Sequence, residues 1–553
     1  MQQIQHWNEP EAIRRLINRL VEVPSISGTA GETLMAEEIV RILREIPYFQ
    51  EHPELVMSVP VPDDPLNRTA VAALYRGNPA SGKTIVLLSH FDVVGVDDFG
   101  YMREHAFHPE RLTEKLRQEF RDALDDEARA DLDSGSYLFG RGVMDMKAGL
   151  AVQLAVLSEL AQTAQFPGNI LLLATPDEEK SSKGMFAAVP FLNRLKQEYG
   201  LDYQLCICSE PNFSAFPGDR SKYIYTGSVG KLLPLILCVG KETHAGEPLE
   251  GINAAWMAAE IIKRMELSSR FVDRVNGEQN PPPTCLKMSD LKTQYDVQTP
   301  NLAYVLYNVL TLSQTPHEVL EKVKQVAAEA AESVYQERLR KYDMHYQGVP
   351  ARSNQVSLPA VYDYSELYRR GSEQFGPSFV EALNRELEEG KKANLDSQGL
   401  SVRIAAKLSS FFIEEAPFYL IMFAPPYYPH VYLDTQSPDE QKLLAVIEQI
   451  KQDAASLFGE TVRVQHFFTG LSDVSYCRIY QPDKVVSTLQ RNMPLWGTEY
   501  KIPIEEIIAL NLPTINLGPF GKDAHKHSER LELHYTTRVV PHLLKRAIQY
   551  ALN

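Results

Sequence analysis

Short apolar runs alternate with amphipathic helical patterns along the chain up to about residue 213. Apolar positions recur at helical spacing in four stretches, at about 11–20, 31–46, 147–160 and from 183 onward. Branched apolar runs typical of buried strands lie between them, at 69–75, 84–89, 169–175 and 203–208. Strands that alternate with helices predict βαβ units, and therefore an α/β fold with a mainly parallel sheet and helices on both faces. In such a sheet, ligands bind outside the carboxyl ends of the strands.

The middle of the chain has a different pattern. Apolar runs typical of strands occur there at 231–240, 285–295 and 301–312. Helical patterns separate or follow them, at 251–265 and 316–335. This order predicts a small α+β domain inserted into the first domain, and an alternating α/β pattern resumes at about residue 438.

These changes of pattern predict a domain organisation. We expect a catalytic domain made of two segments, 1–214 and 431–553, with an inserted domain at 215–430. The inserted domain carries an extra helical insertion at about 345–413, which is rich in Tyr, Ser and Glu. A charged stretch at 104–133 is predicted to be a helical excursion at the surface with a solvated face.

Composition narrows the class of protein. The length of 553 residues favours two or more domains, and the formal net charge of −16 argues against a nucleic-acid partner, since binding a phosphate backbone depends on Lys and Arg. Five cysteines, mostly in apolar runs, indicate reduced core residues rather than a disulfide framework. The amphipathic N-terminus does not resemble a signal peptide, and no apolar run is long enough to span a bilayer. We expect a cytoplasmic protein without a membrane partner.

The strand at 84–89 leads directly into polar residues. His90 and Asp92 follow it in "SHFD", and because side chains alternate along a strand, both point to the same side. Asp145 in "GRGVMDMK" stands just before a helix, where an aspartate is more often an N-cap. Glu178 and Glu179 follow the strand "NILLLAT"; such a pair is usually on a loop surface, but its repulsion is costly near a buried strand unless cations are present.

Two further fragments complete the set. The strand in "LCICSEPN" ends in Glu210, and the strand "TINLG" is followed by a loop that carries His525, although a loop histidine is more often solvated. Each of the five fragments is weak alone. In a parallel sheet, however, five strands that each end in His, Asp or Glu would bring these side chains to one edge.

This grouping predicts a metal site. Three buried carboxylates without compensation would oppose folding, and divalent cations remove that cost. Imidazoles and carboxylates without thiolates suit two zinc ions, with cobalt or manganese as alternatives, and a carboxylate can bridge them. The predicted ligand sets are His90, Asp145 and Glu210 for one ion, and Asp145, Glu179 and His525 for the other.

Two acidic residues remain outside the ligand sets. Asp92 can accept the ring N–H of His90 and hold the imidazole in the orientation that ligation needs. Glu178 can accept a proton from water activated by the ions and later deliver it to a leaving nitrogen. By contrast, Asp97 and Asp98 have no role in the site and are interpreted as solvated loop acids.

The motifs "SHFD", "GRGVMDMK", "DEEKSSKG", "SEP" and "AHKHSE", in this order, resemble the two-zinc exopeptidase and deacylase family. That family includes aminoacylase, acetylornithine deacetylase, succinyl-diaminopimelate desuccinylase, carboxypeptidase G and tripeptide aminopeptidase. The resemblance implies the zinc exopeptidase fold with a lid domain. It is closest to the arginine-utilisation (RocB-type) branch, on "TPNLAYVLYNVLTL" and "GLSDVSY", which implies a place in arginine or ornithine catabolism.

A sixth motif, "THAGEPLEGINAA", lies in the inserted domain. The resemblance implies that its histidine, His244, stabilises the oxyanion of the tetrahedral intermediate, often in the neighbouring subunit, so that the inserted domain acts as a lid and a homodimer interface. The alternative is that His244 caps the helix that follows. The family's lid arginine, which binds a substrate carboxylate, has three candidates here, namely Arg264, Arg270 and Arg274.

The leading hypothesis is therefore a dinuclear zinc-dependent amidohydrolase that cleaves the amide bond of a small peptide or an N-acyl amino acid. A second hypothesis is a catalytically silent metal-binding protein with a regulatory or binding role, but its signature, the loss of the base or of a ligand, is absent from the sequence. A third is a metal hydrolase of phosphate esters or sugar amides. The lid histidine motif favours acyl chemistry over this third reading.

Overall fold

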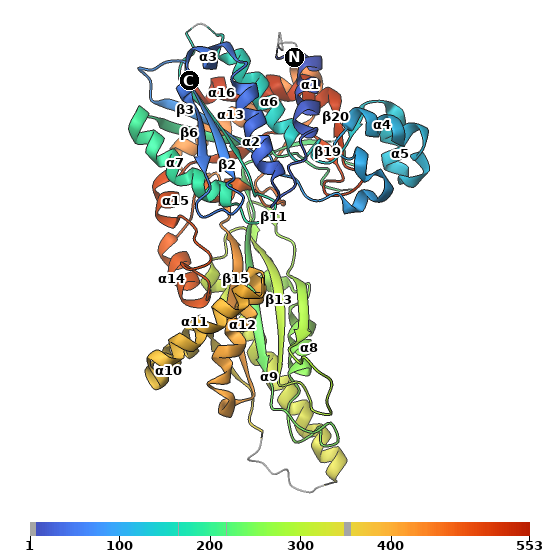
Figure 1. Ribbon diagram of the computed structural model, residues 1–553, viewed down its shortest axis with the longest axis vertical. Helices are drawn as coiled ribbons and strands as arrows, with labels where there is room; N and C mark the ends of the chain where they lie inside the picture. Colours follow the sequence, from blue (N-terminus) through green and yellow to red (C-terminus); the bar gives the residue numbers. More distant parts are fainter. Residues whose placement is uncertain (1–6, 164, 217, 220, 348–355) are drawn as a thin grey trace. The chain divides into compact units, whose positions relative to one another are not determined.

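The computed structural model describes residues 7–163, 165–216, 218–219, 221–347 and 356–553 (Figure 1). Its chain forms two compact units. Unit 1 consists of Met1–Ser228, Val431–Ile479 and Pro503–Asn553, and unit 2 consists of Val229–His430 and Tyr480–Ile502. The segment Tyr480–Ile502 thus groups with unit 2, although the sequence pattern assigns it to the second catalytic segment. The roles of the two units as catalytic domain and lid stay predictions.

Unit 1 is built on an eight-stranded sheet. Its strand order is β1 (Val56–Pro60), β2 (Thr69–Arg76), β5 (Asn169–Thr175), β3 (Lys83–His90), β6 (Asp202–Cys208), β18 (Thr514–Asn516), β7 (Lys222–Tyr225) and β17 (Val462–Gln465). The central strands β5, β3, β6 and β18 are parallel, and β1, β2 and β7 introduce antiparallel pairs. The predicted α/β class is confirmed. Strands β3 and β5 are buried along almost their whole length, as their unbroken apolar runs require.

Helices cover this sheet. The main ones are α1 (Pro10–Val21), α2 (Gly31–Leu43), α6 (Lys147–Leu160), α7 (Lys183–Tyr199), α13 (Pro438–Phe458) and α16 (Val540–Leu552). Helices α6 and α16 pack on β3, while α2 and α7 pack on β2. Helix α6 approaches the end of β6 so closely that a Cβ added at Gly149 would lie 2.1 Å from the carbonyl oxygen of Ser209. The glycine therefore allows the helix to reach the strand end that precedes Glu210.

A small three-stranded antiparallel sheet completes unit 1. It contains β19 (Gly521–Lys522), β20 (Arg530–Glu532) and β4 (Tyr137–Phe139). The charged excursion packs beside it as the 3₁₀ segment Asp97–His105 and the helices α4 (Pro109–Gln118) and α5 (Asp126–Ser134). The excursion has its own hydrophobic core, which includes Phe99, Leu116 and Leu132, and which continues to Val93 and Phe139. The predicted surface helices are present, but one face of them is buried.

Unit 2 contains a five-stranded sheet in the order β12 (Thr284–Asp290), β13 (Leu302–Thr311), β9 (Gly230–Val239), β15 (Phe418–Tyr428) and β14 (Ala360–Asp363). Only the β14–β15 pair is parallel. Its helices are α8 (Ala254–Met265), α9 (Pro316–Tyr346), α10 (Tyr364–Phe375), α11 (Pro377–Lys392), α12 (Ser397–Ser410) and α14 (Pro482–Asn492). Helices α10 to α12 form the part of the predicted insertion that follows 348–355, which lie outside the described residues.

Two expectations about the whole chain can be compared with this structure. All five cysteines are free, and four of them are buried, as predicted for reduced core residues. None of the helices in the described part of the chain has the length and apolar character needed to cross a membrane.

Candidate metal centre

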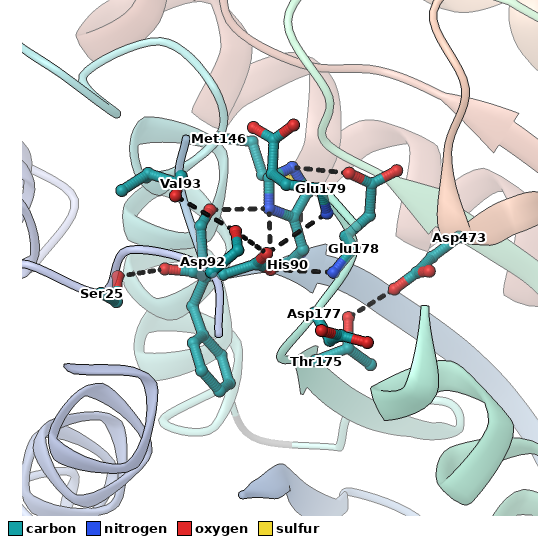
Figure 2. A network of polar contacts seen from close by, with 12 residues as sticks. Ser25, His90, Asp92, Val93, Met146, Thr175, Asp177, Glu178, Glu179 and Asp473 are labelled. Atoms are coloured by element: carbon teal, nitrogen blue, oxygen red, sulfur yellow. Dashed lines mark hydrogen bonds and ion pairs between the residues drawn. The ribbon is translucent and has the colours of Figure 1, made fainter. Parts of the chain in front are cut away.

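Three strands of the large sheet deliver predicted site residues at their carboxyl ends. His90 is the last residue of β3, Glu178 and Glu179 follow β5, and Glu210 follows β6. Asp92 follows shortly after β3, and its carboxylate contacts the Glu178–Glu179 turn (Figure 2). These positions agree with the rule that ligands gather at the carboxyl edge of a parallel sheet.

The other two predicted ligands reach the site by a different route. Asp145 lies between β4 and α6, and His525 lies in the loop between β19 and β20. Strands β4, β19 and β20 belong to the small antiparallel sheet, not to the large one. The expectation that all five fragments would share one edge of a parallel sheet is therefore wrong for Asp145, whose strand β4 is too short to show a hydrophobic period. For His525 the predicted strand "TINLG" is present as β18 of the large sheet, but the histidine lies further on, in a short hairpin that the sequence did not predict.

Asp145 stands between the two histidines. Its Oδ1 is 3.3 Å from Nε2 of His90, and its Oδ2 is 3.2 Å from Nε2 of His525. Glu179 Oε1 lies 3.0 Å from the same nitrogen of His525, and Glu210 Oε1 lies 3.7 Å from Nε2 of His90. Each histidine thus faces one oxygen of Asp145 and one glutamate, in the two groups predicted as ligand sets.

The site holds an excess of buried negative charge. Burial raises the pKa of Glu178 well above its usual value and that of Glu210 to about 7, and the neighbouring carboxylates add to both shifts. Burial also lowers the pKa of His90, but Glu210 and Asp145 together raise it well above its usual value. Hydrogen bonds to Asp145 and Glu179 raise the pKa of His525 to about 10. Bound cations would balance this negative charge.

The donor set fits divalent metal ions. Ligand atoms of His90, Asp145 and Glu179 all lie within 4.8 Å of one another. Imidazole nitrogens and carboxylate oxygens without a thiolate suit zinc and similar first-row ions. The burial of so many carboxylates in one place is explained when cations balance their charge.

Asp92 holds the turn that carries the two glutamates. Its carboxylate accepts hydrogen bonds from the backbone N–H of Glu178 at 3.0 Å, from that of Glu179 at 3.2 Å, and from the hydroxyl of Ser27 at 2.6 Å. The ring Nδ1 of His90 lies 3.1 Å from the carbonyl oxygen of Asp92 and 3.6 Å from its carboxylate. Asp92 therefore orients His90 mainly through its backbone and orients the glutamate turn through its side chain.

A buried arginine, Arg68, stabilises the turn of Glu178 and Glu179 through the neighbouring Asp177. It was not identified from the sequence. The guanidinium of Arg68 donates to Glu32 at 3.0 Å, to Asp177 at 2.6 Å and to Asp64 at 2.7 Å. Glu32 in turn accepts from the backbone N–H of Asp177 at 2.9 Å. Arg68 lies in a polar stretch without periodicity, so only the pairing in three dimensions could reveal this role.

Asp473 is another buried acid near the site. It lies in "GLSDVSY", accepts a hydrogen bond of 2.6 Å from the Thr175 hydroxyl at the end of β5, and is 2% exposed (Figure 2). Burial raises its pKa to about 6. The motif contributed to the family resemblance. The contact of Asp473 with the last residue of β5, however, could not be inferred from the motif.

Asp98 is exposed, as expected, but it also has a partner. Both of its carboxylate oxygens accept hydrogen bonds of 2.8 Å from the buried guanidinium of Arg141. Asp97 is exposed as well, with 89% of its side chain accessible. The sequence did not predict the pairing of Asp98, because its partner lies in a separate motif.

His244 belongs to unit 2. Its loop pairs with the segment around Gln298, and its ring Nδ1 accepts a hydrogen bond of 3.0 Å from the N–H of Gly246. Its role at an oxyanion stays a prediction. Among the arginine candidates, Arg264 pairs with Glu260 and Arg270 pairs with Glu329, so both already have carboxylate partners in their own unit.

Comparisons with known proteins agree with the motifs. The sequence profile of "Peptidase family M20/M25/M40" matches residues 121–490. The uncharacterised protein YqjN of Bacillus subtilis (strain 168) is 38% identical over 549 residues, which cover 99% of this chain and 98% of YqjN. Protein RocB of the same organism is 33% identical over 561 residues, which cover 100% of this chain and 96% of RocB.

A solved structure shares the fold. The crystal structure of a tripeptidase from Staphylococcus aureus subsp. aureus mu50 superposes with a TM-score of 0.51 and 14% identity, and the match covers 100% of both chains. The profile covers more than half of this chain, and YqjN and RocB are similar to it along almost their whole lengths. The chain therefore belongs to peptidase family M20/M25/M40 and is a metal-dependent hydrolase.

Proposed function

We propose that the protein is a two-metal amidohydrolase that cleaves the amide bond of a small peptide or an N-acyl amino acid. The observation that carries this proposal is the position of Asp145, whose two carboxylate oxygens face different histidines at 3.3 and 3.2 Å. A carboxylate shared in this way is the usual bridge of a dinuclear site. Zinc is the proposed metal, and cobalt and manganese are the alternatives.

The described residues divide into two ligand sets. One ion would be held by His90, Asp145 and Glu210. The other would be held by Asp145, Glu179 and His525, so that Asp145 bridges the pair. When bound, the ions would polarise the scissile carbonyl and lower the pKa of water to the neutral range.

Glu178 is the proposed general base. Its carboxylate is buried and lies 3.9 Å from Nε2 of His90, directly beside the ligand atoms. It would take a proton from the attacking water and return it to the leaving nitrogen, and the hydrogen bonds from its turn to Asp92 would keep it in place. His244 would donate to the oxygen of the carbonyl as negative charge develops there.

Unit 2 offers a surface for a homodimer. Strand β12 is the edge of its sheet, and Leu286 and Met288 on that strand are 54% and 41% exposed. The exposed residues Tyr295 and Val297 follow it, and the carbonyl of Val297 accepts a hydrogen bond from the loop of His244. An apolar sheet edge favours pairing with a second copy. A dimer through β12 would carry His244 at its interface.

The cellular setting is also a proposal. The similarity to RocB along the whole chain supports a place in arginine or ornithine catabolism, in the cytoplasm. A catalytically silent protein with the same fold is the second candidate. The complete ligand sets and the buried Glu178 favour the enzyme over this alternative.

The test combines metal analysis with a substrate panel. Protein freed of metal and then loaded with zinc, cobalt or manganese is assayed against dipeptides, N-acyl amino acids and phosphate esters. We expect two ions per chain and hydrolysis of an amide substrate only in the loaded protein. Two bound ions without hydrolysis of any substrate would favour the silent alternative, and turnover of phosphate esters alone would contradict the acyl chemistry.

A further inference from the structure

The loop that carries His525 is held internally by Asp523, which accepts hydrogen bonds from Lys526 and Ser528, but the strands on either side of it are very short. It joins β19 and β20, which have two and three residues, and a hairpin of that length is not stable alone. The side chain of His525 is 49% exposed, and its φ of 65° lies in the left-handed region that non-glycine residues rarely adopt. Its orientation must therefore be imposed by neighbouring elements.

One such neighbour is Asp131 on helix α5 of the charged excursion. Its carboxylate accepts a hydrogen bond of 2.7 Å from Nε of Arg530 and one of 2.8 Å from Nζ of Lys522. Lys522 lies on β19 and Arg530 on β20, so a single carboxylate binds both strands of the hairpin. Arg530 also pairs with Asp523, which lies in the same loop as His525.

A second acid of the excursion acts through Arg141. The guanidinium of Arg141 binds Asp98 at 2.8 Å and donates to Glu529 at 2.7 Å. Glu529 directly precedes β20, and its other oxygen accepts from the N–H of Met144 at 3.3 Å, in the turn of Asp145. The excursion, the Asp145 turn and the hairpin are therefore joined by one hydrogen-bond network, in which Arg141 and Glu529 are buried.

The excursion has its own packed hydrophobic core, which stabilises the residues that make these contacts. Its core runs from Val93, just after Asp92, through Phe99 and Leu132 to Phe139 on β4. Arg141 lies over the ring of Phe99, and Arg530 lies over that of Phe139, at 5.1 and 6.0 Å from the centroids. Both arginines are 1% exposed and each pairs with two acids, so loss of one acid would remove part of the charge that balances a buried guanidinium.

We propose that the excursion, residues 97–134, is a clamp that positions His525 through Asp131 and Asp98 and so determines whether the ligand set of Asp145, Glu179 and His525 binds its ion. The other ligand set takes His90 and Glu210 from the ends of β3 and β6 in the large sheet and shares only Asp145 with this one, so it depends less on the clamp. Asp131 and Asp98 are positioning residues. This inference rests on the proposed two-ion function.

The test compares two substitutions on the same helix. Asp131→Asn removes the carboxylate that binds the hairpin, whereas Asp133→Asn removes the surface pair with Arg121 and leaves the hairpin contacts intact. Zinc binding to the metal-free full chain is measured by calorimetry. In Asp131→Asn we expect the site of His525 to weaken at least ~10-fold and the other site to weaken less, since outer contacts of a metal ligand typically contribute that much. Asp133→Asn should bind both ions as the wild type does.

Hydrogen exchange of residues 521–532 in the metal-free protein is a second readout, independent of the ions. Exchange should be faster in Asp131→Asn, and to a smaller degree in Asp98→Asn, than in the wild type and Asp133→Asn. Unchanged exchange in Asp131→Asn overturns the clamp. Two ions bound by Asp131→Asn with wild-type affinity overturn it too. If the wild type binds fewer than two ions, the proposed two-metal function is refuted. Faster exchange in Asp131→Asn would in that case still show that Asp131 holds the hairpin in place.

Discussion

At the scale of single residues, adjacent acids at this centre have different partners. Glu179 faces His525, while Glu178 faces His90 at 3.9 Å, and the backbone N–H groups of both donate to Asp92. The order of the residues along β5 and its turn therefore separates the proposed ligand from the proposed base. Sequence motifs could identify both glutamates, but the contacts that distinguish them come from the fold.

Replacement of Glu178 tests the proposed base. Glu178→Gln keeps the size of the side chain but cannot accept a proton, so we expect kcat to fall by roughly 10²–10⁴-fold with two ions still bound. Steady-state kinetics and metal analysis of the same sample would check this. Glu179→Gln serves as the comparison, because there both metal content and activity should fall. Activity near the wild-type level in Glu178→Gln would exclude it as the base.

At the scale of elements, the sequence predicted the strands that carry long apolar runs. Strands β3, β5 and β6 and helices α6 and α7 lie where the periods indicate, because burial on both faces leaves a continuous signal. Strands β4, β19 and β20 have two or three residues, which is too short for any period. For this reason the sheet edge was predicted, whereas the hairpin of His525 was not.

The turn between β5 and α7 depends on Arg68, which directly precedes β2. Arg68→Met would leave the buried carboxylates of Glu32, Asp64 and Asp177 without their cation, and we expect a loss of about 3–5 kcal/mol in unfolding free energy. Urea unfolding monitored by circular dichroism would measure it. Arg76→Met, at the other end of β2, removes one long hydrogen bond to Pro79 and a cation–π contact with Tyr199 at 5.5 Å, and should cost about 1 kcal/mol. Equal losses in the two variants would contradict the role given to Arg68.

At the scale of the whole molecule, each unit has its own sheet and its own buried polar groups. In unit 2, His430 is one such group, since burial lowers its pKa to about 4. Its ring stacks on Tyr480, and Nδ1 lies 3.4 Å from the hydroxyl of Thr311. No sequence pattern marked this histidine, because its burial depends on the packing of β15 and the segment Tyr480–Ile502.

This burial predicts a pH dependence of stability. The unfolded chain binds a proton at His430 below about pH 6.5, but the folded chain does so only near pH 4, so stability is complete above about pH 6.5 and falls as the pH drops toward 4. The loss amounts to about 3 kcal/mol over that range. We expect His430→Phe to lose less unfolding free energy between pH 7 and pH 4.5 than the wild type, in urea titrations at both values. The exposed His317 gives the control, since His317→Phe should keep the wild-type difference.

The place of β18 has a consequence for synthesis of the protein. This strand is formed by Thr514–Asn516 but lies between β6 and β7, which come from the first half of the chain. During translation, the edges of β6 and β7 that β18 will cover have no partner until the ribosome has passed residue 516. His525 emerges later still. A nascent chain therefore carries an open sheet edge and lacks the proposed ligand His525 while the whole of unit 2 is being made, so this edge is open to wrong pairing for most of synthesis.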